Sequence, residues 1–122
     1  MTREAAAVSV YNESKQTLLA TRVVVANTGL SRLIGLLGKR SLQANTGIWI
    51  IPANAVHTFG MLFRFDLVLI DRTHKVVGLR ERIAPFLMTW PNFRARSVLE
   101  LPAHTISNSR TAVGDQLRLD SI

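Results

Sequence analysis

Cysteine is absent from this chain of 122 residues, and acidic residues and long hydrophobic runs are scarce. Without thiols the chain can form neither disulfide bonds nor a thiolate metal site, which fits a reducing compartment. The longest apolar stretches, near residues 47–56 and 67–70, are far shorter than the ~20 residues of a membrane-spanning helix. Residues 1–13 lack the apolar segment of a secretory signal. We therefore expect a soluble cytoplasmic protein that does not contact a membrane.

The spacings of familiar catalytic and cofactor motifs are also absent. The chain has no G-x-S-x-G, H-E-x-x-H or dinucleotide-binding glycine pattern, and a glycine-rich stretch at 35–41 departs from the phosphate-binding consensus. The three histidines, His57, His74 and His104, lack metal-ligand spacing. We accordingly predict no metal and no cofactor, and we assign no catalytic residue.

Basic residues outnumber acidic ones by 15 to 8, which gives a formal net charge of +7. Two arginine pairs, Arg80 with Arg82 and Arg94 with Arg96, would each share a strand face if their segments are extended. Because the planar guanidinium suits phosphate and carboxylate groups, these four residues are a candidate anion-binding surface. The competing interpretation, which we prefer, is that the charges serve solubility.

Nucleic acid is not the partner that this sequence favours. The basic stretch lacks the interleaved aromatic residues that stack single-stranded bases, and no helix-turn-helix or zinc-finger spacing occurs. Weak binding of nucleic acid through the arginines is kept as a third hypothesis.

Short runs of β-branched and aromatic residues, separated by turn residues, predict a mainly β domain. Eight strands are expected, over residues 8–11, 18–25, 48–51, 56–61, 65–70, 75–83, 95–101 and 116–119, and the first two should form a hairpin. The spacing of Leu30, Leu33, Ile34 and Leu37 predicts one helix over about 28–38. The fold class that follows is a compact β-barrel or β-sandwich with one short α-helix, in a single domain of residues 1–122.

Four ordered blocks resemble those of the domain of unknown function 192 family of bacteria and archaea. They are R-x-x-G-L at 32–36, H-T-F-G-M at 57–61 before an apolar strand, V-L-E-L-P-A at 98–103 and V-G-D-x-L at 113–117. Two residues depart from the family pattern, because Arg64 replaces a proline and His104 replaces a glycine. Both changes affect backbone freedom, before Asp66 and after Ala103 respectively. The resemblance implies a family without an established activity.

The strongest polar constellation joins these blocks and contains His57, Thr58, Asp66, Arg32 and Glu100. If residues 56–61 and 65–70 pair as a hairpin, His57 and Asp66 lie diagonally on one face, roughly 7–8 Å apart at the backbone. A histidine held by a carboxylate can shuttle protons near neutral pH. The preferred alternative is structural: Asp66, Glu100 and Arg32 neutralise one another at the edge of the core, because a buried charge needs a partner.

An aromatic loop bounded by prolines, residues 84–92, is the other candidate for function. Exposed apolar residues on a loop usually mark a binding site. The preferred interpretation is that the loop closes one end of the core through Phe86 and Trp90, and the alternative is a lid or a partner contact.

Together these features favour a non-enzymatic binding or accessory module, with a protein or a small anionic ligand as its unidentified partner. One alternative is a small hydrolase or isomerase that uses His57 and Asp66 on an anionic substrate. An open pocket lined by His57, Thr58 and Asp66 would favour chemistry. Neither the ligand nor the oligomeric state follows from the residues.

Overall fold

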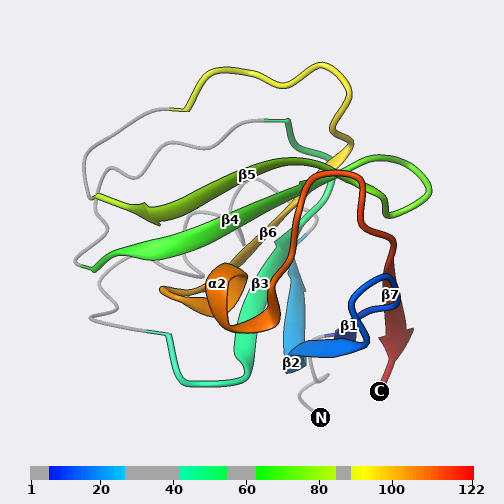
Figure 1. The fold of residues 1–122 in the computed structure, drawn as a ribbon, viewed down its shortest axis with the longest axis vertical. Coiled ribbons are helices and arrows are strands. Elements are labelled where there is room, and N and C mark those ends of the chain that lie inside the picture. Colours follow the sequence, from blue (N-terminus) through cyan, green and yellow to red (C-terminus); the bar gives the residue numbers. More distant parts are fainter. Residues whose placement is uncertain (1–5, 27–41, 55–62, 85–88) are drawn as a thin grey trace, which may run out of the picture.

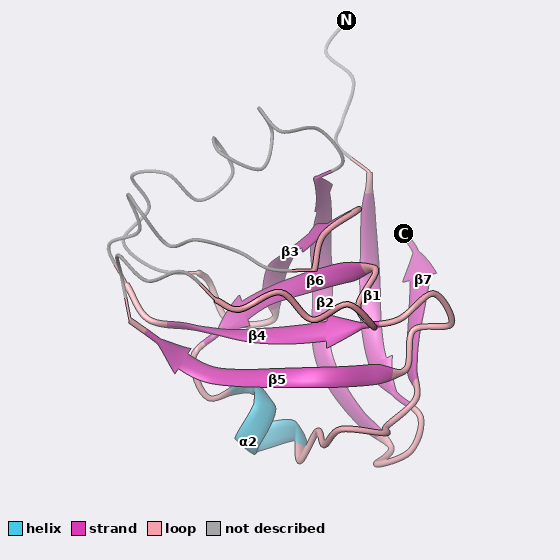
Figure 2. Ribbon diagram, turned by 90° about the horizontal axis from the view of Figure 1, so that it is seen from above, coloured by secondary structure: helices cyan, strands magenta, loops and turns pink. Residues whose placement is uncertain are grey.

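The computed structural model describes residues 6–26, 42–54, 63–84 and 89–122, which form one curled sheet and a short helix (Figures 1 and 2). The elements are β1 (Ala7–Asn12), β2 (Thr17–Ala26), β3 (Thr46–Ile50), β4 (Phe65–Ile70), β5 (Val76–Ile83), β6 (Ser97–Pro102), α2 (Thr105–Ser109) and β7 (Leu117–Ser121). This architecture confirms a mainly β fold. Seven of the eight expected strands correspond to observed ones, and the eighth, at 56–61, lies outside the described residues.

The sheet has the strand order β5-β4-β6-β3-β2-β1-β7. β1 and β2 form the expected antiparallel hairpin, whereas β2 and β3 pair in parallel. The sheet curls into a half-barrel, and the isolated bridge between Lys75 and Gln116 links the chain just before β5 to the chain just before β7. The two outer strands of the sheet are therefore close at one end.

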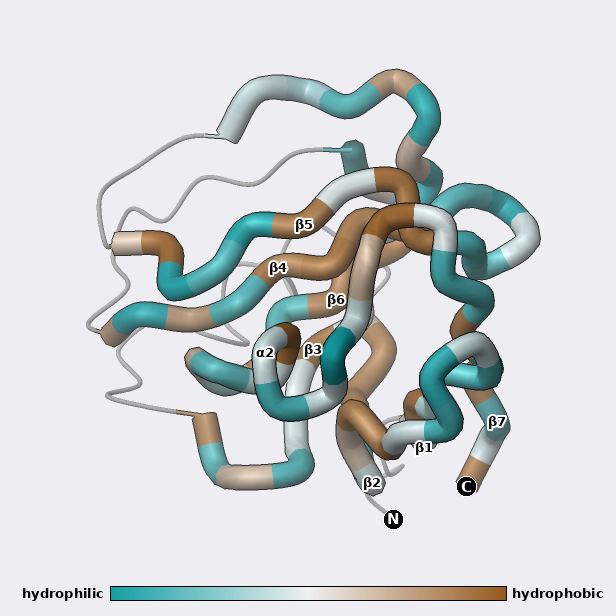
Figure 3. Tube along the Cα trace, in the orientation of Figure 1, coloured by the Kyte–Doolittle hydropathy of each residue, from teal (hydrophilic) through white to brown (hydrophobic). Residues whose placement is uncertain are grey.

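The core lies on both faces of the sheet. Face 1 is the side of Val68, Ile70, Leu99 and Leu101, which pack with residues of β1 and β2. Face 2 is the side of Phe65, Leu67, Leu69 and Val98. All six residues of β4 are buried, and the centre of the sheet is mostly hydrophobic (Figure 3). A strand buried on both sides reads as a continuous apolar run, which is why the sequence indicated a central position for residues 65–70.

The pairing of β4 corrects one expectation. Along its whole length β4 pairs with β6, and on its other edge it pairs with β5. A hairpin between residues 56–61 and β4 is therefore wrong, because neither edge of β4 is free. The backbone separation predicted for His57 and Asp66 loses its basis with it.

Helix α2 was not predicted from the sequence. It spans five residues, and its N-cap residue His104 has the left-handed φ of 76°. Ile106 of α2 joins the core on face 1. So short a helix cannot display the periodicity by which helices are recognised. The helix expected over 28–38 lies outside the described residues.

Candidate functional site

Asp66 is fully buried on face 1, opposite Leu101 of the neighbouring strand. Its Oδ1 accepts a hydrogen bond from the backbone N–H of Arg82 at 2.9 Å, and its Oδ2 accepts one from the N–H of Ile106 at 2.8 Å. Arg82 has a φ of 50° at an irregularity in the β4–β5 pairing, and Ile106 lies in the first turn of α2. The carboxylate therefore fastens a β-bulge and a helix to β4, which is a structural role.

Glu100 lies on the other side of the sheet. It pairs with Leu67 and Ile48, both of which belong to the core on face 2. Because Asp66 faces the opposite side, the structure does not bring these two carboxyl groups together. The expectation that Asp66 and Glu100 form one polar cluster is therefore wrong. The remaining three members, His57, Thr58 and Arg32, lie outside the described residues.

The Glu100 side chain is 4% exposed, and no group in the described residues donates to its Oε2. Burial raises the pKa of this carboxyl to about 8. A buried carboxyl avoids the cost of a charge in apolar surroundings by keeping its proton. Glu100 is therefore neutral at pH 7 and can donate a hydrogen bond from within face 2.

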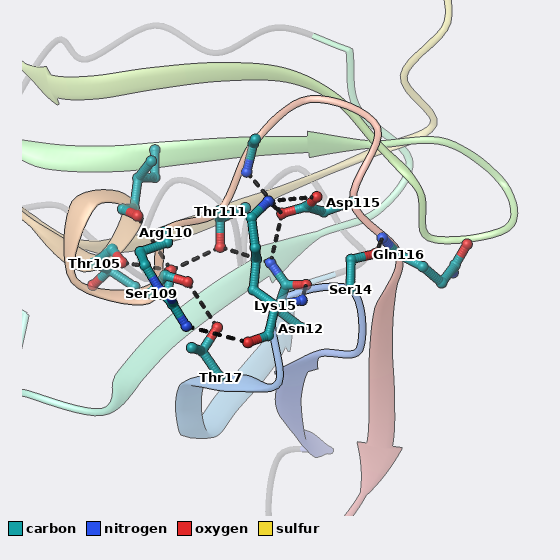
Figure 4. Close-up of polar contacts among 12 residues, drawn as sticks. Asn12, Ser14, Lys15, Thr17, Thr105, Ser109, Arg110, Thr111, Asp115 and Gln116 are labelled. Carbon is teal, nitrogen blue, oxygen red and sulfur yellow. Dashed lines mark hydrogen bonds and ion pairs between the residues drawn. The ribbon is translucent and has the colours of Figure 1, made fainter.

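A second group of polar side chains surrounds Asp115, which precedes β7 and lies against the turn between β1 and β2 (Figure 4). The buried Asn12 amide donates to Thr111 and Asp115, and Lys15 forms a 2.9 Å ion pair with Asp115. Burial works to raise the pKa of Asp115, but the hydrogen bonds from Asn12 and Lys15 hold it below its usual value. Since the carboxylate also accepts the N–H of Ala112, the network is satisfied and fastens the opening hairpin to residues 109–116. This explains the V-G-D block as a structural feature.

The four arginines of the candidate anion surface are all exposed. Within the described ranges, no carboxylate lies within ion-pair distance of Arg80, Arg82, Arg94 or Arg96, and the two ion pairs found there involve Lys15 and Arg118. Their positive charge is therefore not neutralised by described acidic groups. In that part of the chain, no group of three or more histidine, aspartate or glutamate residues is placed to hold a metal ion.

Beside these arginines, residues 89–93 run along β5 (Figure 1) and enclose a hollow of about 380 Å³. The hollow is lined by Leu69, Gly78, Leu79, Arg80, Thr89, Trp90, Pro91, Asn92 and Phe93. Trp90 is 84% exposed and Phe93 is 86% exposed. The expectation that Trp90 closes the core is therefore wrong, because its ring remains in solvent. Phe86, the other residue expected to close the core, lies outside the described residues.

The association of this hollow with the arginines escaped the sequence analysis. The signal was present in the order Trp90, Phe93, Arg94, Arg96, which places two aromatic residues just before two basic ones. The sequence favoured closure of the core for Trp90 and a separate surface for the arginines, so it did not connect the two. Arg80 completes the set, and only the course of the chain past β5 brings it there.

No helix in the described segments is long and apolar enough to cross a membrane.

Comparison with known proteins gives a family and a fold. The sequence matches the family model DUF192, described as "Uncharacterized ACR", over residues 10–119. The structure resembles that of a protein from Sinorhizobium meliloti 1021 described as a "putative transcription regulator", with a TM-score of 0.79 and 18% identity over 98% of this chain and 96% of that chain. It also resembles a protein of unknown function from Novosphingobium aromaticivorans DSM 12444, with a TM-score of 0.70 and 17% identity over 92% of this chain and 83% of that chain. At these identities the likeness shows the fold alone. No curated protein matches the chain.

Proposed function

Because the chain belongs to the DUF192 family, whose description assigns no activity, we propose a function from the surface itself: a non-enzymatic binding module for an anionic ligand. The ligand binds at the hollow between β5 and residues 89–93, where Trp90 and Phe93 contact its apolar part and Arg80 its negative charge.

The observation that carries this proposal is the exposure of two large aromatic side chains beside one hollow. Leaving such rings in water forgoes roughly 25 cal/mol for each Å² of apolar surface that burial would remove from solvent. Single exposed apolar residues are common, but neighbouring aromatics on a loop at a concave surface are characteristic of binding sites. The volume of about 380 Å³ falls within the range of small-molecule sites, ~300–1,000 Å³.

The charge of the surroundings indicates the sign of the ligand. Residues 72–96 contain six basic side chains and one acidic one, Glu81. A guanidinium that has no protein carboxylate nearby is available to a phosphate or carboxylate of a ligand. The hydrolase or isomerase alternative has no comparable support, since both oxygens of Asp66 accept backbone N–H groups.

The proposal is tested by a thermal-shift screen of anionic compounds with and without planar rings. A compound at about a hundredfold excess over its Kd should stabilise the native chain by about 2.7 kcal/mol. The shift should disappear in the double variant W90A/F93A and persist in Leu18→Ala, which truncates an exposed apolar residue of β2. Hits that stabilise both variants equally would refute the proposed site. Mass spectrometry should recover the ligand chemically unchanged, and conversion of the ligand would refute the non-enzymatic role.

A further inference from the structure

The two exposed rings stand on a firmly held backbone. Asn92, between them, donates from its side-chain amide to the Val77 carbonyl of β5 at 3.1 Å, and its Oδ1 accepts the N–H of Arg94 at 3.0 Å. Its backbone N–H donates to the Asn54 carbonyl at 2.9 Å, and its own carbonyl accepts the N–H of Ala95 at 3.0 Å. Four hydrogen bonds thus fix Asn92, one of the two residues between Trp90 and Phe93.

A glycine in β5 makes this attachment close. A Cβ atom at Gly78 would lie 2.9 Å from Nδ2 of Asn92, which is nearer than real Cβ contacts come. Glycine therefore lets the segment approach the strand. Because the backbone under the rings is already ordered, a ligand that contacts them pays little additional entropy to organise the site. The two rings thus form a platform on a preformed backbone.

Basic residues lie in and next to the platform. Arg80 lines the hollow itself, and Arg94 follows Phe93 directly. Arg82, in β5, and Arg96, directly before β6, are also exposed. Glu81 is the acidic residue of this stretch and lowers the local charge by one. The net balance still favours a polyanion that extends beyond the hollow.

We infer that the ligand of this surface is single-stranded nucleic acid, with bases stacked on Trp90 and Phe93 and phosphates bound by Arg80 and Arg94. This inference rests on the proposed function and names its ligand class. Aromatic rings beside basic side chains are the combination by which proteins hold unpaired bases without reading sequence. The flanking arginines supply the charge neutralisation that dominates affinity for nucleic acids.

The geometry favours this ligand over two other polyanions. A duplex hides its base faces in the stack, so a duplex would engage the arginines and leave the rings unused. An anionic membrane is bound through an apolar face that enters the headgroup region. Here the rings flank a concave surface that Arg80 and Asn92 also line, and this arrangement suits a flat base with polar edges.

The experiment measures binding of the full chain to fluorescently labelled oligothymidylate and oligouridylate of about 12 nucleotides, within the site sizes known for single-strand binders. Truncating either ring, in Trp90→Ala or Phe93→Ala, should weaken binding about 5-fold to 150-fold. With three or four phosphate contacts, affinity should fall about 20-fold to 50-fold between 50 and 200 mM salt. Arg80→Gln should lower the slope of that salt dependence by about 0.7.

Matched variants separate this site from general charge. Arg22→Gln removes an exposed arginine of β2, and Leu18→Ala removes an exposed apolar side chain of the same strand. Neither change should weaken binding by as much as Arg80→Gln or Trp90→Ala does. Binding should also quench tryptophan fluorescence. The variant Trp90→Phe should retain most of the affinity but lose the quench, because the remaining Trp49 is half-buried in β3 against the core of face 1 and does not line the hollow.

Two results overturn the inference and leave the proposed function standing. One is failure to bind either oligonucleotide while a small anionic ring compound still binds and is lost in W90A/F93A. The other is selective binding to phosphatidylserine vesicles that depends on the same two rings. Equal affinity for duplex and single strand, unaffected by W90A/F93A, also overturns the inference, because it would reflect net charge alone. If no anionic probe responds to W90A/F93A, both the inference and the proposed function fail.

Discussion

Asp66 and Glu100 are buried carboxyl groups on adjacent strands, yet they differ in their hydrogen bonds. Each oxygen of Asp66 accepts a backbone N–H, whereas Oε2 of Glu100 has no donor in the described part of the chain. Burial favours the neutral form of a carboxyl group, and this desolvation raises the pKa of Glu100. The side of the sheet to which each residue points decides which groups it meets.

The role of Asp66 is tested by Asp66→Asn. The amide has one accepting oxygen, so either the N–H of Arg82 or that of Ile106 would face an NH₂ group. We expect a loss of about 1–3 kcal/mol in the free energy of unfolding, measured by urea denaturation. The exposed Asp120→Asn should change stability by less than about 0.5 kcal/mol. An Asp66→Asn protein as stable as the native chain would contradict the assigned role.

The raised pKa of Glu100 predicts a particular dependence of stability on pH. In the unfolded chain this carboxyl loses its proton near the usual value of 4.5, whereas the folded protein retains it to about 8. Between these values the native state binds more protons than the unfolded state, so stability falls as pH rises. The slope from this group is at most about 1.4 kcal/mol per pH unit.

Glu100→Gln isolates this contribution. The amide does not ionise, and the contributions of the other titrating groups cancel when the stabilities of the two proteins are compared. The variant should gain stability relative to the native chain steadily from pH 5 to about 8, and the difference should level off above that value. Denaturation curves at a series of pH values provide the measurement. Parallel pH profiles for the two proteins would show that Glu100 is ionised at neutral pH.

At the scale of elements, the turn from β6 into α2 places a histidine in a left-handed backbone conformation. His104 has a φ of 76°, in the left-handed region that glycine adopts without strain. In the family pattern that the sequence resembles, glycine stands at this position. Arg64, which replaces the usual proline, is exposed and donates from its guanidinium to the Arg82 carbonyl at 3.1 Å, beside the bulge.

Restoring glycine in His104→Gly should therefore stabilise the protein. The relief of left-handed strain, about 1–2 kcal/mol, exceeds the extra unfolded-state entropy of glycine, about 0.4–1 kcal/mol. We expect a net gain of about 0.5–1 kcal/mol in thermal or urea unfolding. Asn108→Gly, at an exposed position within α2, should instead destabilise. A loss of stability in His104→Gly would mean that the imidazole makes a favourable contact that offsets the strain.

At the scale of the whole molecule, the sheet is uneven in its protection from solvent. β4 and β6 are buried along nearly their whole length and have a strand on each side, whereas β7 is an outer strand with mostly exposed side chains. Amides in β4 and β6 should exchange with solvent only through global unfolding, and those of β7 through smaller openings. Hydrogen exchange followed by NMR should therefore find the slowest amides in the two central strands. Equal protection of β7 would contradict this.

The sequence by itself determined the class of the fold and most of its strands. Period-2 patterns and turn residues are local properties, so they located the segments that became β1 to β7. The doubly apolar run at 65–70 also indicated a central strand, because both of its faces must be covered. The need of Asp66 for partners was equally predictable from the cost of a buried charge.

Only the tertiary structure decided which groups meet. The donors to Asp66 lie 16 and 40 residues away along the chain, and β6, from residues 97–102, takes the edge of β4 that a nearby hairpin was expected to fill. Likewise, Arg80 joins Trp90 and Phe93 because residues 89–93 pass along β5. A residue pattern shows which side chains share a face of a strand, but strand order and the path of a loop depend on packing of the whole chain. For that reason the sequence could supply the members of the candidate site and not their association.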